Sequence, residues 1–293
     1  MRKRFHLFVI FMAIAAAIGV FGGNHAHAAD RISVTVAGKG PDVVLIPGLA
    51  SSGAVWDATV KQLSAAHRVH VVQVAGFAGA PVAGNAEGAV VEPLVEAVDG
   101  YIKANHLKGP AVIGHSMGGF TGLLLARRHP EDVGRLMVVD SLPFFAVLFS
   151  PAATVETVKP QAAAMRDGVI AMSPEAFASQ QAMTAPRFSK SPEGQALILD
   201  WSKASSQSVV GRAMYDLLTT DARGELAAIK TPVTLLYPFD PAMGAPVAAI
   251  DKTYAEAYAA LPGVTLKRID DARHFIMLDQ PQAFAAAVET FLK

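Results

Sequence analysis

The sequence predicts an α/β fold, in which a mostly parallel sheet is covered by helices on its faces. Short apolar runs alternate with longer segments of helical periodicity along most of the chain, and this order is typical of parallel sheets flanked by helices. The apolar run 111–113 leads into Gly114-His115-Ser116-Met117-Gly118, and an apolar helical pattern then continues to Arg128. A strand, a sharp turn and a helix are therefore expected around Ser116.

Composition supports a single well-packed domain. Hydrophobic residues make up 52% of the 293 residues and charged residues 17%, which is too apolar for a disordered chain. The formal net charge is zero, so nothing indicates nucleic acid or another polyanion as a partner. The chain has no cysteine, which excludes disulfides, thiolate metal sites and a cysteine nucleophile.

The first 28 residues have the pattern of a signal peptide. Three basic residues at 2–4 precede the apolar run 5–21, and Ala26-His27-Ala28 has the small-x-small form of a cleavage site. We therefore expect export to the periplasm or secretion, with a domain at 29–293. The alternative is a retained membrane anchor, because the apolar run is long for a signal peptide. Only in that case is a membrane partner expected.

The remaining elements follow from apolar periodicity. The run 31–37 alternates apolar and polar residues and predicts a half-exposed edge strand, whereas continuous apolar runs predict strands buried on both faces. We expect buried strands at 43–46, 136–139 and 233–237, and further strands at 69–74, 111–113 and 264–269. Helices are expected at 54–66, 88–107, 246–261 and 281–292, and after the turn at Ser116.

Polar groups and turns follow several of these strands. Leu49, Ser116 and Asp140 each lie within three residues of the end of an apolar run, and functional groups in parallel sheets gather at the carboxyl ends of strands. Gly114 and Gly118 remove side chains that would crowd a serine on a strained turn. Since serine is a poor nucleophile at neutral pH, it needs an adjacent base.

These residues resemble the α/β-hydrolase superfamily, over nearly all of the chain after residue 30. The resemblance rests on Gly-x-Ser-x-Gly between a strand and a helix. It implies that Ser116 is the nucleophile and that His274, which follows the last strand, is its base. His115 is expected to point away from Ser116, because adjacent side chains diverge. His67, His70, His106 and His129 lie near element ends and are expected to be solvated.

The resemblance also implies a carboxylate that orients the base. Asp240 satisfies the family order of serine, acid and histidine, at the end of the strand before His274. Its loop departs from the family's frequent Gly-x-x-Asp, being one residue shorter and free of glycine. Asp140 is the alternative acid, at the end of the preceding apolar run. Asp270 and Asp271 are expected to cap or to face solvent.

An oxyanion hole is implied at two backbone amides. One is the N–H of Leu49, in a loop where Pro47 replaces the family's usual histidine, and the other is the N–H of Met117. The region 142–221 has several short helical stretches rich in Met and Phe. By resemblance it is a helical cap over the site, inserted before the strand that carries Asp240.

The function expected from these residues is hydrolysis of a carboxylic ester through an acyl-enzyme on Ser116. The substrate is expected to be a small molecule with an apolar acyl group. No cluster of His, Asp and Glu at metal-ligand spacing and no dinucleotide-binding glycine motif occurs in the sequence, so no metal and no cofactor are expected. Two alternatives stay open: C–C bond, lactone, thioester or peptide hydrolysis at the same triad, and a ligand-binding protein with little turnover.

Overall fold

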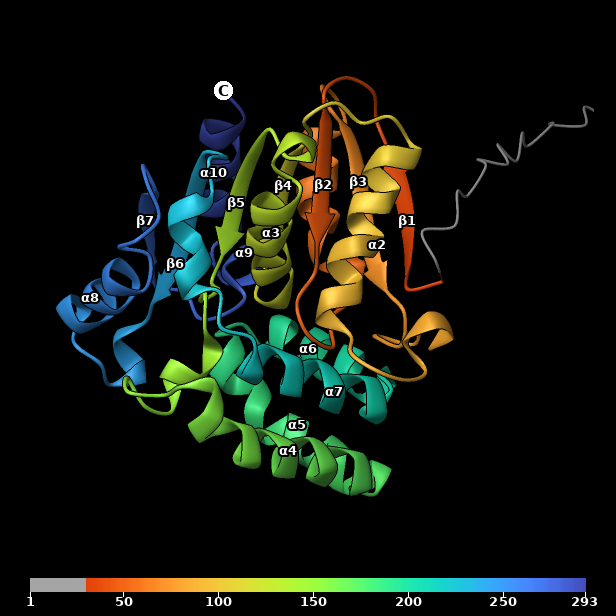
Figure 1. The fold of residues 1–293 in the computed structure, drawn as a ribbon, viewed down its shortest axis with the longest axis vertical. Coiled ribbons are helices and arrows are strands. Elements are labelled where there is room, and N and C mark those ends of the chain that lie inside the picture. Colours follow the sequence, from red (N-terminus) through yellow and green to blue (C-terminus); the bar gives the residue numbers. More distant parts are fainter. Residues whose placement is uncertain (1–29) are drawn as a thin grey trace, which may run out of the picture.

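The computed structural model describes residues 30–293, so the expected signal peptide at 1–28 lies outside the described residues. A seven-stranded sheet has the strand order β1-β3-β2-β4-β5-β6-β7 (Figure 1), antiparallel between β1 and β3 and parallel throughout the rest. Its strands are β1 (Ile32–Ala37), β2 (Asp42–Ile46), β3 (Arg68–Val74), β4 (Ala111–His115), β5 (Arg135–Val139), β6 (Val233–Phe239) and β7 (Thr265–Asp270). The α/β prediction and the edge position of the first strand are confirmed.

β4 lies at the centre of the sheet, between β2 and β5. Gly114 is in register with Ile46 on one side and with Val138 on the other. Because these three strands are parallel and end at the same level, the loops that follow them meet at one edge of the sheet. The register therefore brings the segments after Ile46, His115 and Val139 together.

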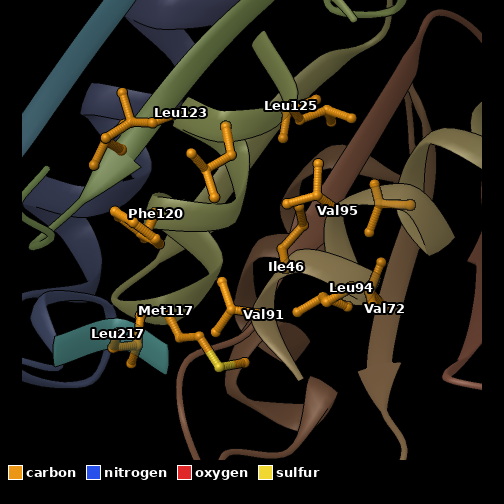
Figure 2. Packing of buried hydrophobic residues seen from close by; sticks show 14 of the residues in the cluster. Ile46, Val72, Val91, Leu94, Val95, Met117, Phe120, Leu123, Leu125 and Leu217 are labelled. Carbon is orange, nitrogen blue, oxygen red and sulfur yellow. The ribbon is translucent and has the colours of Figure 1, made fainter. Parts of the chain in front are cut away.

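Helices cover both faces of the sheet. The helices of the body are α1 (Asp57–Leu63), α2 (Val91–Ala104), α3 (Met117–Arg128), α8 (Val247–Ala257), α9 (Ile276–Asp279) and α10 (Pro281–Leu292). One buried cluster joins the sheet to α2 and α3, and a second joins it to α1 and α10. Figure 2 shows the first cluster, where Met117 and Phe120 of α3 lie near Val91 of α2.

Four helices lie between β5 and β6, in the region where the cap was expected. They are α4 (Val155–Ala171), α5 (Pro174–Phe188), α6 (Pro192–Ala204) and α7 (Gln207–Thr219), and they lie below the carboxyl edge of the parallel strands (Figure 1). Leu217 of α7 belongs to the same buried cluster as Phe120. The loop 75–81 supports the cap, since Gly79 N–H donates to Ala204 O at 3.0 Å.

Some boundaries differ from the sequence prediction. The expected helix 54–66 is divided into a 3₁₀ turn (Gly53–Trp56) and α1, and the helix expected from 88 begins at Val91. The one-turn helix α9 was not expected. Among residues 30–293, no helix combines the length and the apolar character needed to cross a lipid bilayer.

Candidate functional site

Ser116 occupies a strained turn between β4 and α3. Its φ of 53° and ψ of −119° lie in a region that non-glycine residues rarely adopt. Hydrogen bonds hold this backbone in place, since Ser116 N–H donates to Val139 O at 2.9 Å and Ser116 O accepts from Phe120 N–H at 3.0 Å. The turn therefore fixes Ser116 at the carboxyl edge of the central strand.

The two motif glycines are required by close backbone packing. A Cβ at position 114 would lie 2.1 Å from Gly118 O, and a Cβ at 118 would lie 2.2 Å from Ile46 O. Neither distance is compatible with a side chain, and the atoms approached are backbone carbonyls that cannot rotate away. The glycines are thus required by contacts within the turn and with the end of β2, and not by crowding of Ser116 itself.

His274 lies on the loop between β7 and α9, and its carboxylate partner is Asp140. The His274 Nδ1 to Asp140 Oδ2 distance is 2.6 Å, which is typical of a charge-assisted hydrogen bond. Ser116 and His274 both line the two lobes of the cavity under the cap. Of the two acids considered from the sequence, the alternative one is therefore in contact with the histidine.

Asp140 is held in a defined orientation. Its φ is 45°, and its N–H donates to Leu236 O at 2.8 Å. Tyr254 OH donates to Asp140 Oδ1, which leaves Oδ2 for His274. Burial, followed by the charge of Asp140, raises the pKa of Tyr254 well above its usual value, so this phenol stays a donor. No sequence motif marked Tyr254, which lies 114 residues from Asp140.

The preference for Asp240 as the partner of His274 is wrong in this structure. Its Oδ2 accepts from Arg273 Nε at 2.7 Å, and its Oδ1 accepts from Ala242 N–H at 3.1 Å. The physical reason is that this carboxylate is held by other partners: it caps the 3₁₀ turn that begins at Pro241 and is bound by Arg273. The cap consequently follows the strand that carries the partner of His274, instead of preceding it.

The two expected oxyanion donors flank Ser116. Met117 is the first residue of α3, so its N–H has no acceptor one turn earlier in that helix. Leu49 lies in a turn in which Ser51 N–H donates to Gly48 O at 3.3 Å. A Cβ at Gly48 would lie 3.1 Å from Ser116 Cβ, so this turn is packed against the serine. The oxyanion role of the two amides stays a prediction.

His115 packs against His274. This contact was not predicted from the sequence. The side chain is fully buried, and its Nε2–H donates to His274 O at 3.0 Å. The two imidazole rings lie 4.5 Å apart between centroids. Burial, and then the nearby His274, lower the pKa of His115 well below its usual value, so it supports the His274 backbone as a neutral ring.

This buried neutral histidine predicts a pH dependence of stability. The unfolded chain protonates position 115 as pH falls through about 6.5, whereas the folded protein does not, so the free energy of unfolding is expected to decrease below pH 6.5. One such group contributes up to about 1.4 kcal/mol per pH unit. The free energy of unfolding, measured with urea between pH 5 and 8, should change less with pH in His115→Gln than in the wild type. An unchanged dependence on pH would contradict the assignment.

A second buried histidine corrects the expectation of solvation at element ends. His70 is 2% exposed, and its ring nitrogens lie 2.7 Å from Tyr101 OH and 2.9 Å from Asp42 Oδ1. Burial is the largest influence on the pKa of His70 and lowers it. His70 lies on β3 and does not line the cavity under the cap.

Under the cap is an apolar cavity of two lobes, with volumes of about 440 Å³ and 540 Å³. Both lobes are lined by Leu49, Ser116, Met165, Phe188, Met214 and His274. The first lobe extends between cap helices along Val169, Met172, Phe177, Ile198 and Val210. The second extends toward the body along Phe145, Leu218, Phe239, Ile250 and Tyr254. The lobes thus meet at Ser116 and His274.

Within residues 30–293, the cluster of Glu96, Asp99 and His129 brings possible metal-ligand atoms within 4.8 Å of one another. Its groups are already paired, since His129 Nε2 lies 3.2 Å from Glu96 Oε1 and Lys103 Nζ donates to Asp99 Oδ2 at 2.8 Å. His129 with Glu131 and Asp132 forms an overlapping group. We assign no metal site to these residues.

An alpha/beta hydrolase family model matches residues 43–287. The chain belongs to that family. The match spans the turn at Ser116, the cap and the His274 loop, and it confirms the expectation of an enzyme with the α/β-hydrolase fold.

The chain is similar to curated esterases over nearly its whole length. It is 28% identical, over 89% of this chain and 99% of the relative, to pimeloyl-[acyl-carrier protein] methyl ester esterase of Aeromonas hydrophila. It is 29% identical to the protein of the same name in Aromatoleum aromaticum, over 86% and 98% of the two chains. The relatives are thus named for cleavage of an ester bond.

Solved structures share the fold. A thermophilic esterase from Thermogutta terrifontis has a TM-score of 0.74 at 21% identity, with 89% of this chain and 92% of that chain covered. The enol-lactonase from Burkholderia xenovorans LB400 has a TM-score of 0.72 at 21% identity, covering 89% and 96%. At this identity the likeness concerns the fold alone.

Proposed function

We propose that this protein hydrolyses carboxylic esters through an acyl-enzyme on Ser116. The observation that carries the proposal is the 2.6 Å contact between His274 Nδ1 and Asp140 Oδ2. His274 lines the same two lobes of the cavity as the strained Ser116. Esterases of similar length and sequence support ester bonds as the target.

In the proposed reaction His274 moves the proton. Because Nδ1 is bonded to Asp140, Nε2 is the nitrogen that takes the proton from Ser116 Oγ as it attacks the ester carbonyl. Collapse of the tetrahedral intermediate breaks the bond to the alcohol oxygen, which leaves with that proton. A water molecule, deprotonated by His274, then attacks the acyl-enzyme. The bond between the acyl carbon and Ser116 Oγ breaks, His274 returns the proton to that oxygen, and the acid is released. Asp140 holds the ring in this tautomer and stabilises the imidazolium that forms.

The amides of Leu49 and Met117 are proposed to receive the oxyanion. Donors placed where negative charge develops stabilise the transition state more than the substrate, and losing one donor of this kind costs on the order of a hundredfold in rate. Met117 N–H also points from the first turn of α3, where the helix dipole favours negative charge.

The cavity supports an ester with an apolar group on each side of the carbonyl. Its two lobes are both lined mainly by apolar side chains and meet at Ser116. We propose that one lobe receives the acyl chain and the other the alcohol group. Apolar lining with a few polar groups at the reacting centre is typical of small-molecule sites.

The proposal is tested by a two-way panel of esters. Acyl chains from acetyl to dodecanoyl are varied with one chromogenic alcohol, and alcohols are varied with one acyl group. Gly168 and Ala245 line different lobes, and a Cβ at 168 would meet no atom within 4 Å. Gly168→Phe and Ala245→Phe are each expected to shift the length optimum on one side of the ester only.

Two outcomes would contradict the proposal. If folded wild-type protein turns over no ester of the panel, ester hydrolysis is wrong, and the same protein is then assayed with lactones and thioesters. If both variants shorten the preferred length of the same part of the ester, acyl chain or alcohol, the assignment of one part to each lobe is wrong. Export of the protein stays a prediction from residues 1–28.

A further inference from the structure

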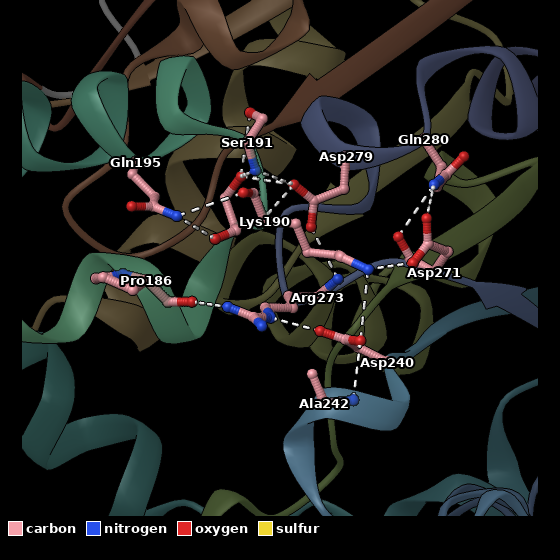
Figure 3. A network of polar contacts seen from close by, with 11 residues as sticks. Pro186, Lys190, Ser191, Gln195, Asp240, Ala242, Asp271, Arg273, Asp279 and Gln280 are labelled. Atoms are coloured by element: carbon pink, nitrogen blue, oxygen red, sulfur yellow. Dashed lines mark hydrogen bonds and ion pairs between the residues drawn. The ribbon is translucent and has the colours of Figure 1, made fainter.

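Asp240 is a buried charge that the proposed reaction does not use. Its side chain is 2% exposed, yet it is surrounded by donors, with Arg273 Nε at 2.7 Å and Lys190 Nζ at 3.4 Å (Figure 3). Burial alone would raise the pKa of Asp240, but the hydrogen bond from Arg273 and the neighbouring cations hold it below its usual value. The carboxylate is therefore charged at neutral pH.

The two cations come from different parts of the molecule. Arg273 directly precedes His274 on the loop of the body, whereas Lys190 lies between α5 and α6 of the cap. Arg273 Nη1 also donates to Pro186 O in α5, and Lys190 also pairs with Asp271. Asp240 is thus an acceptor that the histidine loop and the cap share.

A second carboxylate reinforces the same junction. Asp279 Oδ1 accepts from Ser189 Oγ at 2.6 Å and from Lys190 N–H at 2.9 Å, while its Oδ2 accepts from Arg273 N–H at 2.9 Å. Phe275 N–H donates to Phe188 O at 2.9 Å. Residues on both sides of His274 are therefore bonded to the cap segment 186–191.

We propose that Asp240 is a positioning residue, which acts through Arg273 and Lys190 to hold the His274 loop against the cap. The inference rests on the proposed function, because it concerns the placement of the proposed base. Removing the carboxylate leaves two partly buried cations without their central acceptor. They are then expected to turn toward water, and Arg273 moves its neighbour His274 away from Asp140 and Ser116.

The cap offers a matched control on another contact with the body. Asp216 of α7 accepts from Val90 N–H at 2.6 Å and from Val91 N–H at 3.1 Å. Like Asp240, it is a carboxylate that joins cap and body. Within the described part of the chain, its hydrogen bonds involve none of residues 271–279. Asp216→Asn therefore reports what weakening the cap contact does by itself.

The experiment compares Asp240→Asn with Asp216→Asn in the full chain. Misplacing a catalytic group by about 1 Å can cost about a hundredfold, so Asp240→Asn is expected to lower kcat by about 10- to 100-fold with little change in KM. Asp216→Asn is expected to leave kcat within about threefold. Asp240→Glu, which keeps the charge, should recover part of the loss. If Asp240→Asn does not fold, Lys190→Gln is measured instead. It removes the more exposed of the two cations that bind Asp240, and it should also lower kcat, by a smaller factor.

Amide hydrogen exchange gives a readout that does not depend on turnover. Asp240→Asn is expected to speed exchange in residues 271–279 and 186–191, whereas Asp216→Asn should not. Unchanged exchange in these segments, unchanged kcat, or equal losses of kcat in both variants would each overturn the positioning role. Wild-type protein without ester turnover contradicts the proposed function instead, and the exchange experiment still decides whether Asp240 joins the loop to the cap.

Discussion

Ser116→Ala is expected to reduce ester turnover by about 10⁴- to 10⁶-fold, leaving only the rate that binding and oxyanion stabilisation supply. The reason is that no acyl-enzyme can form without the hydroxyl. Alanine is smaller than serine and keeps the Cβ, so the turn with φ of 53° gains no new contact. Steady-state rates on the best ester of the panel, with circular dichroism to confirm folding, measure the effect.

Ser141→Ala is the matched control for this variant. Ser141 is 1% exposed, and its Oγ has no hydrogen-bond partner among the described residues. It also lies at the carboxyl edge of the sheet, one strand from Ser116. Its loss is expected to change turnover by less than about threefold. Turnover by Ser116→Ala close to that of Ser141→Ala would place the nucleophile elsewhere.

Asp140→Asn is expected to lower kcat by about 10⁴-fold, and so by far more than Asp240→Asn. An amide cannot stabilise the imidazolium as a carboxylate does, and it no longer fixes the tautomer in which Nε2 accepts a proton. In the wild type, Tyr254 OH donates to Oδ1 of Asp140 and His274 Nδ1 donates to Oδ2. An asparagine has only one side-chain oxygen, so its NH₂ group would face one of these two donors.

The ratio of the two variants decides which aspartate acts with His274. Rates are measured for Asp140→Asn and Asp240→Asn on the same ester, with unfolding by urea to correct for stability. A larger loss in Asp240→Asn than in Asp140→Asn would restore the assignment favoured from the sequence. Equal losses of less than tenfold would contradict a triad acid at either position.

The sequence by itself determined the architecture and the place of the serine. Apolar runs of strand length alternate with helical periodicity, and this pattern depends on local preferences and burial that each segment carries within itself. The turn at Ser116 was equally local, because Gly114 and Gly118 lie two residues from the serine whose strained backbone they accommodate. The resemblance to the α/β-hydrolases, together with its position after the last strand, predicted His274 as the base.

Only the tertiary structure decided which carboxylate meets His274, and what surrounds that pair. Asp140 and Asp240 both end buried strands that are neighbours in the sheet, so their positions along the chain do not distinguish them. The choice depends on where each carboxylate points: Asp140 has a left-handed backbone and is held by Tyr254, while Asp240 is drawn toward Arg273. These contacts join residues far apart in sequence, and a side chain's direction is fixed by such partners and not by the residue type alone.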